Sequence, residues 1–525
     1  MSPEAKGRNW FVIVAVWLPI VVIVTLGVKY FLFPFFDSKL EKETGSESRY
    51  SKGQITLAAD SFNGYAIFRT DEFINRQKER GIRFVVKDDQ ANYKARIDSL
   101  KNGDIDMAVF TIDSFIKASA LIKQFPGSIV MVIDESSGAD GFVAYESAIT
   151  SLQELNYPEA KIVLTLNSPT EFFARVLVSH LSVNISESKW VEAEGSTDVL
   201  ARFKKSDKNS KQAYGLWEPE LSQVLEIPGV KLLIDSSKLK GYIIDVLVVN
   251  REFLKDHQDM VHDVVEDYQK TLYSYQQGNG LADLVRSDAK KSGIKLTDKQ
   301  VERIVGGIVW KNTLENYAHF GLLSGQESKG LENLEDIIAN VSKVLVQTGS
   351  MSENPTLGKE HNLFFSQVLS GMKDADFHPG RAVNILSDDV GVKLDLDEIQ
   401  ERAKLSALTD EQWEQLVPEV EMRTVPINFG RGRASITIQG QRDLNELAKN
   451  LEAWPDYYLL VVGNASTEGD IEANVQLAKK RSESVVEYLI SGGMNENRIK
   501  AKASAPSGKG AKSRTVEFVL AQKPY

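Results

Sequence analysis

An uninterrupted apolar stretch near the N-terminus is the strongest constraint on this chain. From Trp10 to Val28 every residue is apolar, small or proline. At a rise of about 1.5 Å per residue, a helix of this length spans about 28 Å, close to the ~30 Å hydrocarbon core of a bilayer. A cleaved signal peptide is the alternative, but the stretch is too long for one and no A-x-A pattern ends it. We therefore predict a single transmembrane anchor over residues 10–36, because no second run approaches this length.

Charged residues on either side of the stretch predict its orientation. Lys6 and Arg8 precede it, whereas acidic residues follow it from Asp37 onward. The positive-inside rule then places residues 1–9 in the cytoplasm as a short tail and the remainder of the chain outside. Residues 37–53 are polar, with Gly and Ser, and predict a linker. We therefore expect a single pass through a membrane, with the bulk of the chain on its outer side.

Composition excludes several classes of function. The 525 residues are 42% hydrophobic and 26% charged, which is typical of folded domains rather than disordered chain. The net charge of −11 argues against a nucleic-acid partner. With no cysteine, the chain has no disulfide framework, thiolate zinc site or cysteine nucleophile. No P-loop, GxSxG, HExxH or GxGxxG motif stands in a suitable context, so we predict no enzymatic activity, cofactor or metal site.

Short apolar runs alternate with helical stretches from residue 54 onward. Strands are predicted over residues 55–59, 83–87, 106–110 and 128–134, and helices over residues 66–81, 93–102 and 113–123. The same rhythm restarts at residues 161–166. Such alternation is typical of a parallel sheet with helices on both faces. We predict an α/β fold of two lobes over residues 54–345, with a ligand cleft between them.

Seven segments of this region resemble the periplasmic solute-binding proteins of the nitrate, sulfonate and thiamine-precursor type. They occur in family order and are DSFNGYAIF at 60–68, LKNGDIDMAVFTIDSF at 100–115, DESSGADGFVA at 134–144, NSPTEFF at 167–173, WEPELSQVL at 217–225, GYIIDVLVVNREFL at 241–254 and GIVWKNTLENYAHFG at 307–321. The resemblance implies a type 2 periplasmic-binding fold that closes on a small molecule. It also implies a separate permease or signalling membrane protein as a partner.

Polar and aromatic residues between strands and helices form the candidate ligand site. Small hydroxyl residues there leave helix N-terminal N–H groups open to an anion or polar group, although the same residues are ordinary helix caps. Aromatic residues could supply stacking walls. The candidate ligand-binding residues are Ser61, Phe62, Asn63, Tyr65, Thr111, Ser136, Ser137, Ser168, Thr170, Trp217 and Glu218. We interpret Asp245 as a lobe or hinge contact instead. The expected ligand is a small polar or anionic solute, but Glu171 and Glu218 would disfavour a bare anion if they point inward.

Residues 421–525 carry a second resemblance. The pattern is strand, helix, strand, helix, strand, strand, with an I-x-F opening, Gly463, Asn474-x-x-Leu477-x-x-x-Arg481 and Arg514-x-Val516-Glu517. It resembles the OmpA-like peptidoglycan-binding domain, an α+β fold. The resemblance implies that an Asp and an Arg hold the diaminopimelate of the peptidoglycan stem peptide. Arg481 and Asn474 match that family by position, whereas Ser466 stands where the family has the Asp.

Together, the two resemblances imply a single pass through the inner membrane of a Gram-negative bacterium, with the bulk of the chain in the periplasm. Two functions from different classes remain open for the whole chain. Residues 346–420 are predicted to be a helical connecting segment between the two modules. The first function is a membrane-anchored binding component or sensor that takes up a solute and contacts peptidoglycan. The second is a structural scaffold that links inner membrane to cell wall with a degenerate cleft. A fillable cleft favours the first function, whereas a cleft plugged by Phe62, Phe172 or Trp217 favours the second.

Overall fold

The computed structural model describes residues 50–323, 332–375, 377–379, 405–424, 426–507 and 510–523. The predicted cytoplasmic tail, the anchor at 10–36 and nearly all of the linker at 37–53 lie outside these described residues. Within the described part of the chain, no helix combines the length and the apolar character needed to cross a bilayer.

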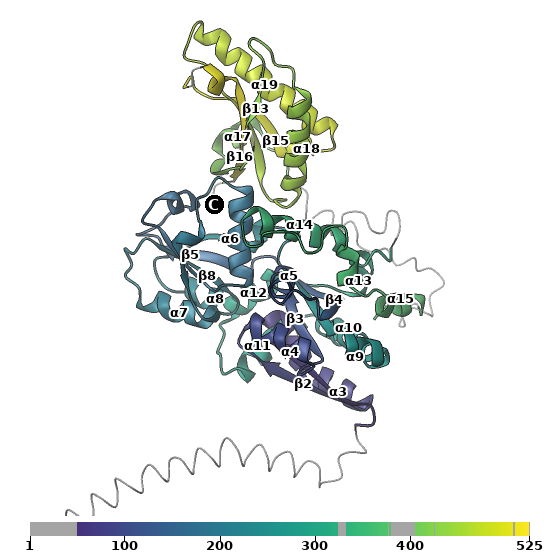
Figure 1. Ribbon diagram of the computed structural model, residues 1–525. Coiled ribbons are helices and arrows are strands. Elements are labelled where there is room, and N and C mark those ends of the chain that lie inside the picture. Colours follow the sequence, from purple (N-terminus) through teal and green to yellow (C-terminus); the bar gives the residue numbers. More distant parts are fainter. Residues whose placement is uncertain are drawn as a thin grey trace, which may run out of the picture.

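Lobe one is a six-stranded sheet covered by helices (Figure 1). Its strands, in spatial order, are β2 (Ile82–Asp88), β1 (Gly53–Ala59), β3 (Met107–Thr111), β10 (Ile244–Asn250), β4 (Gly127–Ser136) and β11 (Ile308–Trp310). Its first helices are α3 (Asp71–Glu79), α4 (Tyr93–Asn102) and α5 (Ile112–Leu121). β1 pairs in parallel with β2 and β3, and every residue of β3 and β4 is buried. Continuous apolar strands of this kind fit a sheet covered on both faces.

The predicted helix over residues 66–81 is divided in two. A short 3₁₀ helix, η3 (Asn63–Arg69), precedes α3, and Thr70 between them is extended. The Thr70 hydroxyl accepts a hydrogen bond from the Phe73 N–H at 3.1 Å. A threonine that caps a helix in this way ends the preceding turn, because its side chain replaces a backbone acceptor.

Lobe two is a five-stranded sheet formed by the part of the chain between β4 and β10 of lobe one. Its strands, in spatial order, are β7 (Trp190–Glu192), β6 (Lys161–Leu164), β8 (Gln212–Trp217), β5 (Asp140–Tyr145) and β9 (Val230–Asp235). Its helices are α6 (Pro169–His180), α7 (Gly195–Lys205) and α8 (Glu220–Leu225). β6 is parallel to β7 and β8, whereas β5 is antiparallel to both of its neighbours.

Two crossovers join the lobes and lie side by side. The chain leaves lobe one after β4, enters lobe two at β5, and returns from β9 to β10, which is antiparallel to β3 and β4. The hydroxyls of Ser136 and Ser236 are 2.7 Å apart, and Ser136 also donates to the Asp140 carboxylate at 2.6 Å. The Ser236 hydroxyl in turn accepts from the Gly138 N–H at 2.8 Å. These buried bonds fasten the two crossovers into one hinge.

Further helices surround both lobes. They are α9 (Arg251–Asp256), α10 (Gln258–Tyr275), α11 (Gly280–Lys291), α12 (Asp298–Gly307), α13 (Thr313–His319), α14 (Leu334–Gln347) and α15 (Gln367–Asp374). α14 packs against α5 of lobe one and α6 of lobe two, while α15 packs on α10 and α13. The predicted connecting segment therefore contributes α15 to lobe one.

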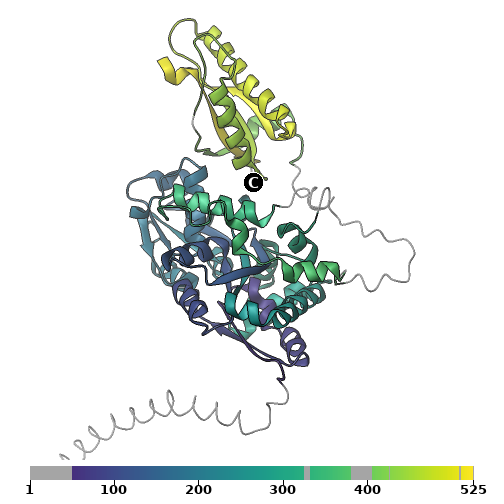
Figure 2. The same ribbon diagram turned by 45° about the vertical axis from the view of Figure 1, so that its right-hand side comes forward.

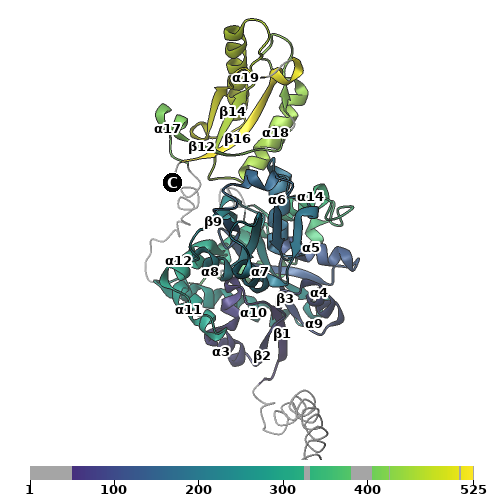
Figure 3. The ribbon, with the colours of Figure 1, turned by 90° about the vertical axis from the view of Figure 1, so that its left-hand side faces the viewer.

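The C-terminal domain stands on lobe two, at the end of the molecule away from β1 and β2 (Figures 2 and 3). Its strands are β12 (Val417–Glu421), β16 (Thr515–Gln522), β14 (Tyr458–Gly463) and β15 (Ile499–Ala503), with β13 (Ile427–Asn428) pairing with β16. Its helices are α17 (Asp410–Gln415), α18 (Ile438–Glu452) and α19 (Ile471–Ser491). α17 and β12 fall within the predicted connecting segment, yet β12 pairs with β16 and Trp413 packs on Tyr458.

Gly463 shows why this domain requires a glycine where its central strand ends. A Cβ atom at this position would lie 2.1 Å from the Ala478 carbonyl oxygen of α19. That distance is far below van der Waals contact, so only glycine allows the strand and the helix to approach so closely.

A buried histidine joins lobe two, the hinge and the C-terminal domain. The Trp454 indole donates to His180 Nδ1 at 2.9 Å, and His180 Nε2 lies 3.0 Å from the Tyr242 hydroxyl. Because an indole can only donate, Nδ1 accepts and the neutral ring carries its proton on Nε2. Burial lowers the pKa of His180 to about 4, and Lys343 adds to this effect. Tyr242 belongs to the crossover between β9 and β10, so this contact reaches the hinge itself.

Backbone bonds strengthen the same interface. The Ser182 N–H donates to the Glu421 carbonyl at 2.8 Å, and the Arg423 N–H donates to the His180 carbonyl at 2.7 Å. The hinge takes part directly, because the Lys240 N–H donates to the Ala453 carbonyl at 2.9 Å. A polar cavity of about 290 Å³, lined in part by Lys343 and Glu446, lies beside these contacts.

We expect acid to release the C-terminal domain from lobe two. The pKa of buried His180 is below its ordinary value, so the attached state binds this proton less readily than the detached state does. The contact is therefore fully stable above pH ~6.5 and weakens as pH falls toward 4, by at most about 3 kcal/mol from this group. Thiol-specific dyes on Leu121→Cys and Ile471→Cys, both exposed positions, report the domain separation by energy transfer.

Two alanine variants distinguish the effect of His180 from that of other groups that titrate in this pH range. His180→Ala should give a larger dye separation already at pH 7.5, because it leaves the Trp454 N–H without its acceptor. His257→Ala, at an exposed position, should behave as the unsubstituted chain does. An unchanged separation in His180→Ala at every pH would contradict the role assigned to this contact.

Candidate ligand cleft and C-terminal loops

Both lobes contribute side chains to one small cavity. Its lining residues are Asp60, Phe62, Tyr65, Tyr93 and Asp245 from lobe one, and Asp140, Pro169 and Trp217 from lobe two. The space open to the centre of a water molecule is about 10 Å³, which is room for about one water. The described state is therefore a closed cleft.

Aromatic rings form one side of the cavity. Phe62 and Tyr65 meet edge to face with ring centroids 5.2 Å apart, and both follow β1 directly. Trp217 approaches from the end of β8 in lobe two and is 8% exposed. The Tyr65 hydroxyl donates to the Asp245 carboxylate. The rings thus supply apolar faces, and their one directed bond holds an acidic group in place.

Carboxyl groups form the other side. Asp60 is paired with Arg96 at 3.1 Å. No ion pair between described residues reaches Asp134, Asp140 or Asp245. Oδ1 of Asp140 is buried and has no hydrogen-bond partner in the described part of the chain, whereas the buried Asp134 carboxyl group lies within hydrogen-bond reach of that of Asp245. Burial raises the pKa of Asp134 and of Asp140 to about 7, and it raises that of Asp245 well above its usual range.

Three of the predicted ligand residues line the cavity, namely Phe62, Tyr65 and Trp217. Several others are used within the protein. Ser136 is part of the hinge, and the Thr111 hydroxyl is 2.6 Å from that of Ser114.

Further predicted residues also lie outside the lining. Ser61 is exposed in a shallow hollow beside Arg69, and Asn63 donates to Asp288 on α11 at 3.2 Å. The Ser137 N–H donates to the Gly307 carbonyl at 2.8 Å.

At the start of α6 the capping interpretation describes the structure. The Ser168 hydroxyl donates to the Thr165 carbonyl at 2.6 Å and lies 3.0 Å from that of Thr170. Glu218 is fully buried, accepts from the Ser222 hydroxyl at 2.9 Å and faces Arg303 at 3.3 Å. Helix N-termini here are satisfied by the protein's own side chains.

The acidic residues of the cavity were not among the predicted ligand residues, and Asp245 was assigned to a hinge contact. Asp60 follows β1, and Asp140 begins β5 inside the GADG sequence. The available signal was therefore an Asp at the end of a strand on each side of a crossover. That signal also fits a turn or a helix cap, so it does not by itself distinguish a ligand site.

Contacts between the lobes keep the cleft closed. Lys117 of α5 pairs with Glu171 of α6 at 2.6 Å, and the Ser114 hydroxyl donates to the Asn167 carbonyl at 3.3 Å. Burial opposes ionisation of Glu171, but Lys117 and Arg175 outweigh it and hold its pKa below its usual value. The Lys117–Glu171 pair is thus an ion pair between the lobes that stabilises the closed cleft.

Of the candidate peptidoglycan residues, Asn474 and Arg481 lie on α19, and Ser466 lies on the loop between β14 and α19. Arg481 is 3% exposed and donates to the backbone carbonyls of Arg433, Ser513 and Gly430 at 2.9, 3.3 and 3.2 Å. The Asn474 amide donates to the Ser466 and Glu468 carbonyls at 3.2 and 2.8 Å, and the Ser466 hydroxyl accepts from the Glu468 N–H. The three predicted residues therefore organise the loops around the site.

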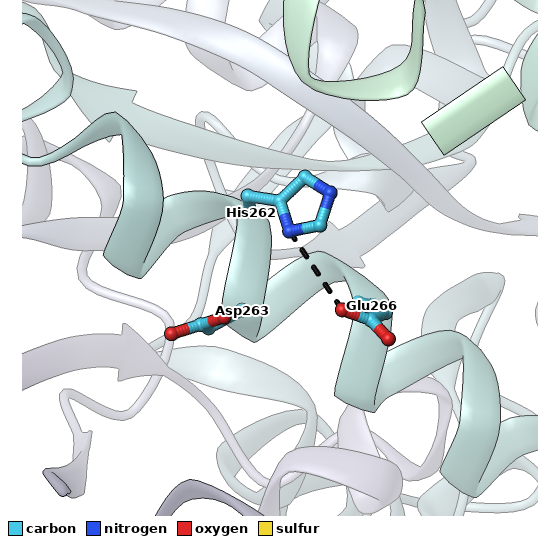
Figure 4. A group of neighbouring side chains, drawn as sticks. All are labelled: His262, Asp263 and Glu266. Atoms are coloured by element: carbon cyan, nitrogen blue, oxygen red, sulfur yellow. Dashed lines mark ion pairs between the residues drawn. The ribbon is translucent and has the colours of Figure 1, made fainter. Parts of the chain in front are cut away.

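One group on α10 has the composition of a metal site. His262 and Glu266 point toward each other, with His262 Nδ1 3.7 Å from a Glu266 oxygen, whereas the Asp263 side chain extends away from them (Figure 4). Arg80 pairs with both acidic residues, and Lys52 binds Asp263 at 2.6 Å. The carboxylates are thus already neutralised by cations, and the group ties the start of β1 and α3 to α10.

Comparisons with known proteins agree with the C-terminal assignment. Residues 428–517 match the model of the OmpA family. The peptidoglycan-binding protein ArfA of Mycobacterium tuberculosis is 30% identical over 105 residues, which cover 18% of this chain and 32% of that protein. ArfA of Mycobacterium bovis gives the same values. The chain thus spans only 32% of the length of these curated relatives.

Solved structures similar to the two lobes include three bacterial binding proteins. A ligand-binding component of an ABC-type import system from Staphylococcus aureus is 13% identical, with a TM-score of 0.46 over 61% of this chain and 98% of that chain. The sulphonate-binding protein SsuA of Escherichia coli is 13% identical, with a TM-score of 0.43 over 60% and 92%. The nitrate-binding protein NrtA of Synechocystis is 10% identical, with a TM-score of 0.46 over 61% and 88%. Residues 428–517 are thus an OmpA-family domain, which follows an α/β body of two lobes.

Proposed function

We propose that this chain is a membrane-anchored periplasmic protein that binds a small solute between its lobes and contacts peptidoglycan through its C-terminal domain. The observation that carries the proposal is the small cavity between the lobes, which is built from both of them and lies beside a double crossover. A ligand held from both sides favours the closed arrangement over an open one by its differential affinity. The proposed mechanism is non-covalent.

The arrangement of the modules supports a position between membrane and wall. The apolar stretch at residues 10–36 and the linker at 37–53 precede β1 in the sequence. β1 lies at the end of the molecule opposite the C-terminal domain (Figures 1 and 3). A membrane anchor and a wall-binding domain would therefore pull on opposite ends of the body. The relatives of the C-terminal domain are named as peptidoglycan-binding proteins.

The small cavity favours a second candidate, a scaffold that links membrane to wall without a ligand. Phe62 and Trp217 occupy the cleft and leave about 10 Å³ between them. Phe172 plays no part in this, since it packs near Tyr242 with ring centroids 6.3 Å apart. The two candidates differ in whether the lobes open in solution and whether a small molecule leaves the cells with the protein.

We expect Lys117→Met to open the cleft. The substitution removes the cation that joins α5 to Glu171, while Arg175 still pairs with that carboxylate at 2.7 Å. Loss of one partly buried pair should shift the closed–open equilibrium about 5- to 30-fold toward the open state. Dyes on Leu121→Cys and Tyr157→Cys, at exposed sites in the two lobes, measure the change by energy transfer.

Lys101→Met, at an exposed position on α4, serves as the control and should leave the lobe distance unchanged. Native mass spectrometry of the full-length protein purified from cells then tests for a retained small molecule. The scaffold function would be supported instead if the lobes of Lys117→Met stay closed and neither this variant nor the unsubstituted protein retains a small molecule.

We expect Ser466→Asp to increase retention on purified peptidoglycan. The substitution restores the carboxylate that could receive the ammonium group of a stem peptide, in a half-buried position on the loop after β14. A gain of one charge-assisted bond corresponds to a roughly 10-fold change in affinity. A gain in binding also cannot result from misfolding.

Ser491→Asp places the same charge at the far end of α19 and should leave retention as it was. Arg481→Ala removes three bonds to loop carbonyls, so its melting temperature must be measured together with its retention. If Arg481→Ala stays folded and is retained as before, the assignment of this site fails.

A further inference from the structure

We propose that the interlobe cleft binds a small organic cation, an amine or quaternary ammonium compound held between carboxylates of both lobes and aromatic rings. This inference rests on the proposed solute-binding function and specifies the chemical class of the solute. It departs from the anionic solute that the helix N-termini had indicated.

The first argument is the charge of the cleft. Asp60, Asp140 and Asp245 line the cavity, and only Asp60 has a cationic partner among described residues. That partner, Arg96, is shared with Asp89. Lys311, a further buried cation of lobe one, is bound to Glu135 at 2.7 Å. Buried carboxylates without a counter-charge are costly, so the cleft gains most from a ligand that brings positive charge.

The second argument is an unused acceptor in the cavity wall. Asp140 is 2% exposed, and its Oδ1 has no donor, although Oδ2 accepts from Ser136. Buried polar atoms in native proteins are nearly always hydrogen-bonded, and an exception at a cavity indicates a missing partner. An N–H group of a protonated amine, or the hydroxyl group of a cation such as choline, would donate to this oxygen.

The third argument is the position of the two carboxylates. Asp140 begins β5 in lobe two, and Asp245 is in β10 of lobe one. A cation between them is attracted to both lobes at once. It would hold the lobes together, less tightly closed than in the described state because the present cavity has room for about one water, and it would neutralise carboxylates that repel each other without it.

The aromatic side of the cavity suits the same ligand. Phe62, Tyr65, Tyr93 and Trp217 all line the space. The faces of aromatic rings attract cations, with a contribution of about 2 kcal/mol when the site is desolvated. The same rings would accept the methyl or methylene groups that surround an organic ammonium nitrogen.

An anion would find fewer partners here. The N–H of Asn167 donates to Glu171 at 2.5 Å, and Ser168 accepts from the Glu171 N–H at 3.5 Å. These N–H groups at the start of α6 are therefore engaged with the protein's own side chains. A sulfonate or nitrate in the cavity would instead face the carboxylates of Asp140 and Asp245, which have no cationic partner among the described residues.

Binding of choline to the full-length protein in detergent provides the test, with 3,3-dimethylbutan-1-ol as the uncharged compound of the same shape. Isothermal titration calorimetry is run with these two, with tetramethylammonium and putrescine, and with methanesulfonate and nitrate. We expect at least one of the cations to bind at one per chain, and choline to bind at least 10-fold more tightly than its uncharged counterpart. Asp140→Asn should weaken the binding of that cation at least 10-fold.

Two substitutions control for folding. Asp140→Asn keeps an oxygen for Ser136, and Asp245→Asn keeps one for Tyr65, so both should melt as the unsubstituted protein does. Asp104→Asn, at an exposed site, should leave cation binding unchanged.

Each outcome of these measurements tests the cation proposal separately from the proposed solute-binding function. Binding of methanesulfonate or nitrate without binding of any cation overturns the cation proposal and leaves solute binding standing. Equal affinity for choline and its uncharged counterpart overturns it in the same way. Binding of none of the probes also overturns it, and if the lobes of Lys117→Met stay closed as well, the proposed solute-binding function fails with it.

Discussion

The double crossover between the lobes is the constraint on which the rest of the structure depends. Ser136 and Ser236 join the two crossing segments through one buried hydroxyl pair. Asp140 and Asp245 follow these segments closely, at the beginnings of β5 and β10. Each lobe therefore presents a carboxylate at the point where it meets the other. Any rotation about the hinge changes the distance between these two carboxylates. Movement of the hinge and opening of the cleft are therefore the same motion.

The C-terminal domain contacts both lobe two and the hinge. His180 lies at the end of α6 and contacts Tyr242 of the second crossover, while Lys240 of the same crossover donates to the Ala453 carbonyl. Trp454 completes the contact from the C-terminal side. Because packed interfaces change in discrete steps, a movement of the crossover is transmitted to the domain that stands on it. Wall binding and solute binding would then be linked by one small group of buried side chains.

Local patterns in the sequence predicted most of the elements. α4 has the bounds expected from its apolar spacing, and the order of elements after β13 in the C-terminal domain is as predicted. The helix expected over residues 66–81 was interrupted because the Thr70 hydroxyl caps a new helix. All of β12 except Glu421 falls within the segment predicted to be a helical connection, and its sequence, VPEVE, contains a proline and acidic residues, which are uncommon in strands. An edge strand tolerates such a sequence, since it pairs with β16 alone.

The candidate site was predictable only in part, and the physical reason is topology. Phe62 and Tyr65 are large apolar residues directly after a strand, a position that by itself indicates a cleft wall. Asp140 and Asp245 come together only because β10 returns to lobe one between β3 and β4. Pairing at such sequence separation leaves no local signal, and an isolated Asp at a strand end resembles a turn residue.

Arg481 illustrates how one residue can serve both the architecture and the ligand of a site. A guanidinium group has five N–H donors, and Arg481 uses one on each of its three nitrogens for loop carbonyls among the described residues. One N–H then remains on each terminal nitrogen, which is the pair that a carboxylate binds in a fork. With the side chain 3% exposed, a stem-peptide carboxylate can reach that pair only if the loops at Gly430 or Ser513 move aside. Binding at this site would therefore cost loop bonds that the ligand must replace, and the missing carboxylate at Ser466 makes that replacement harder.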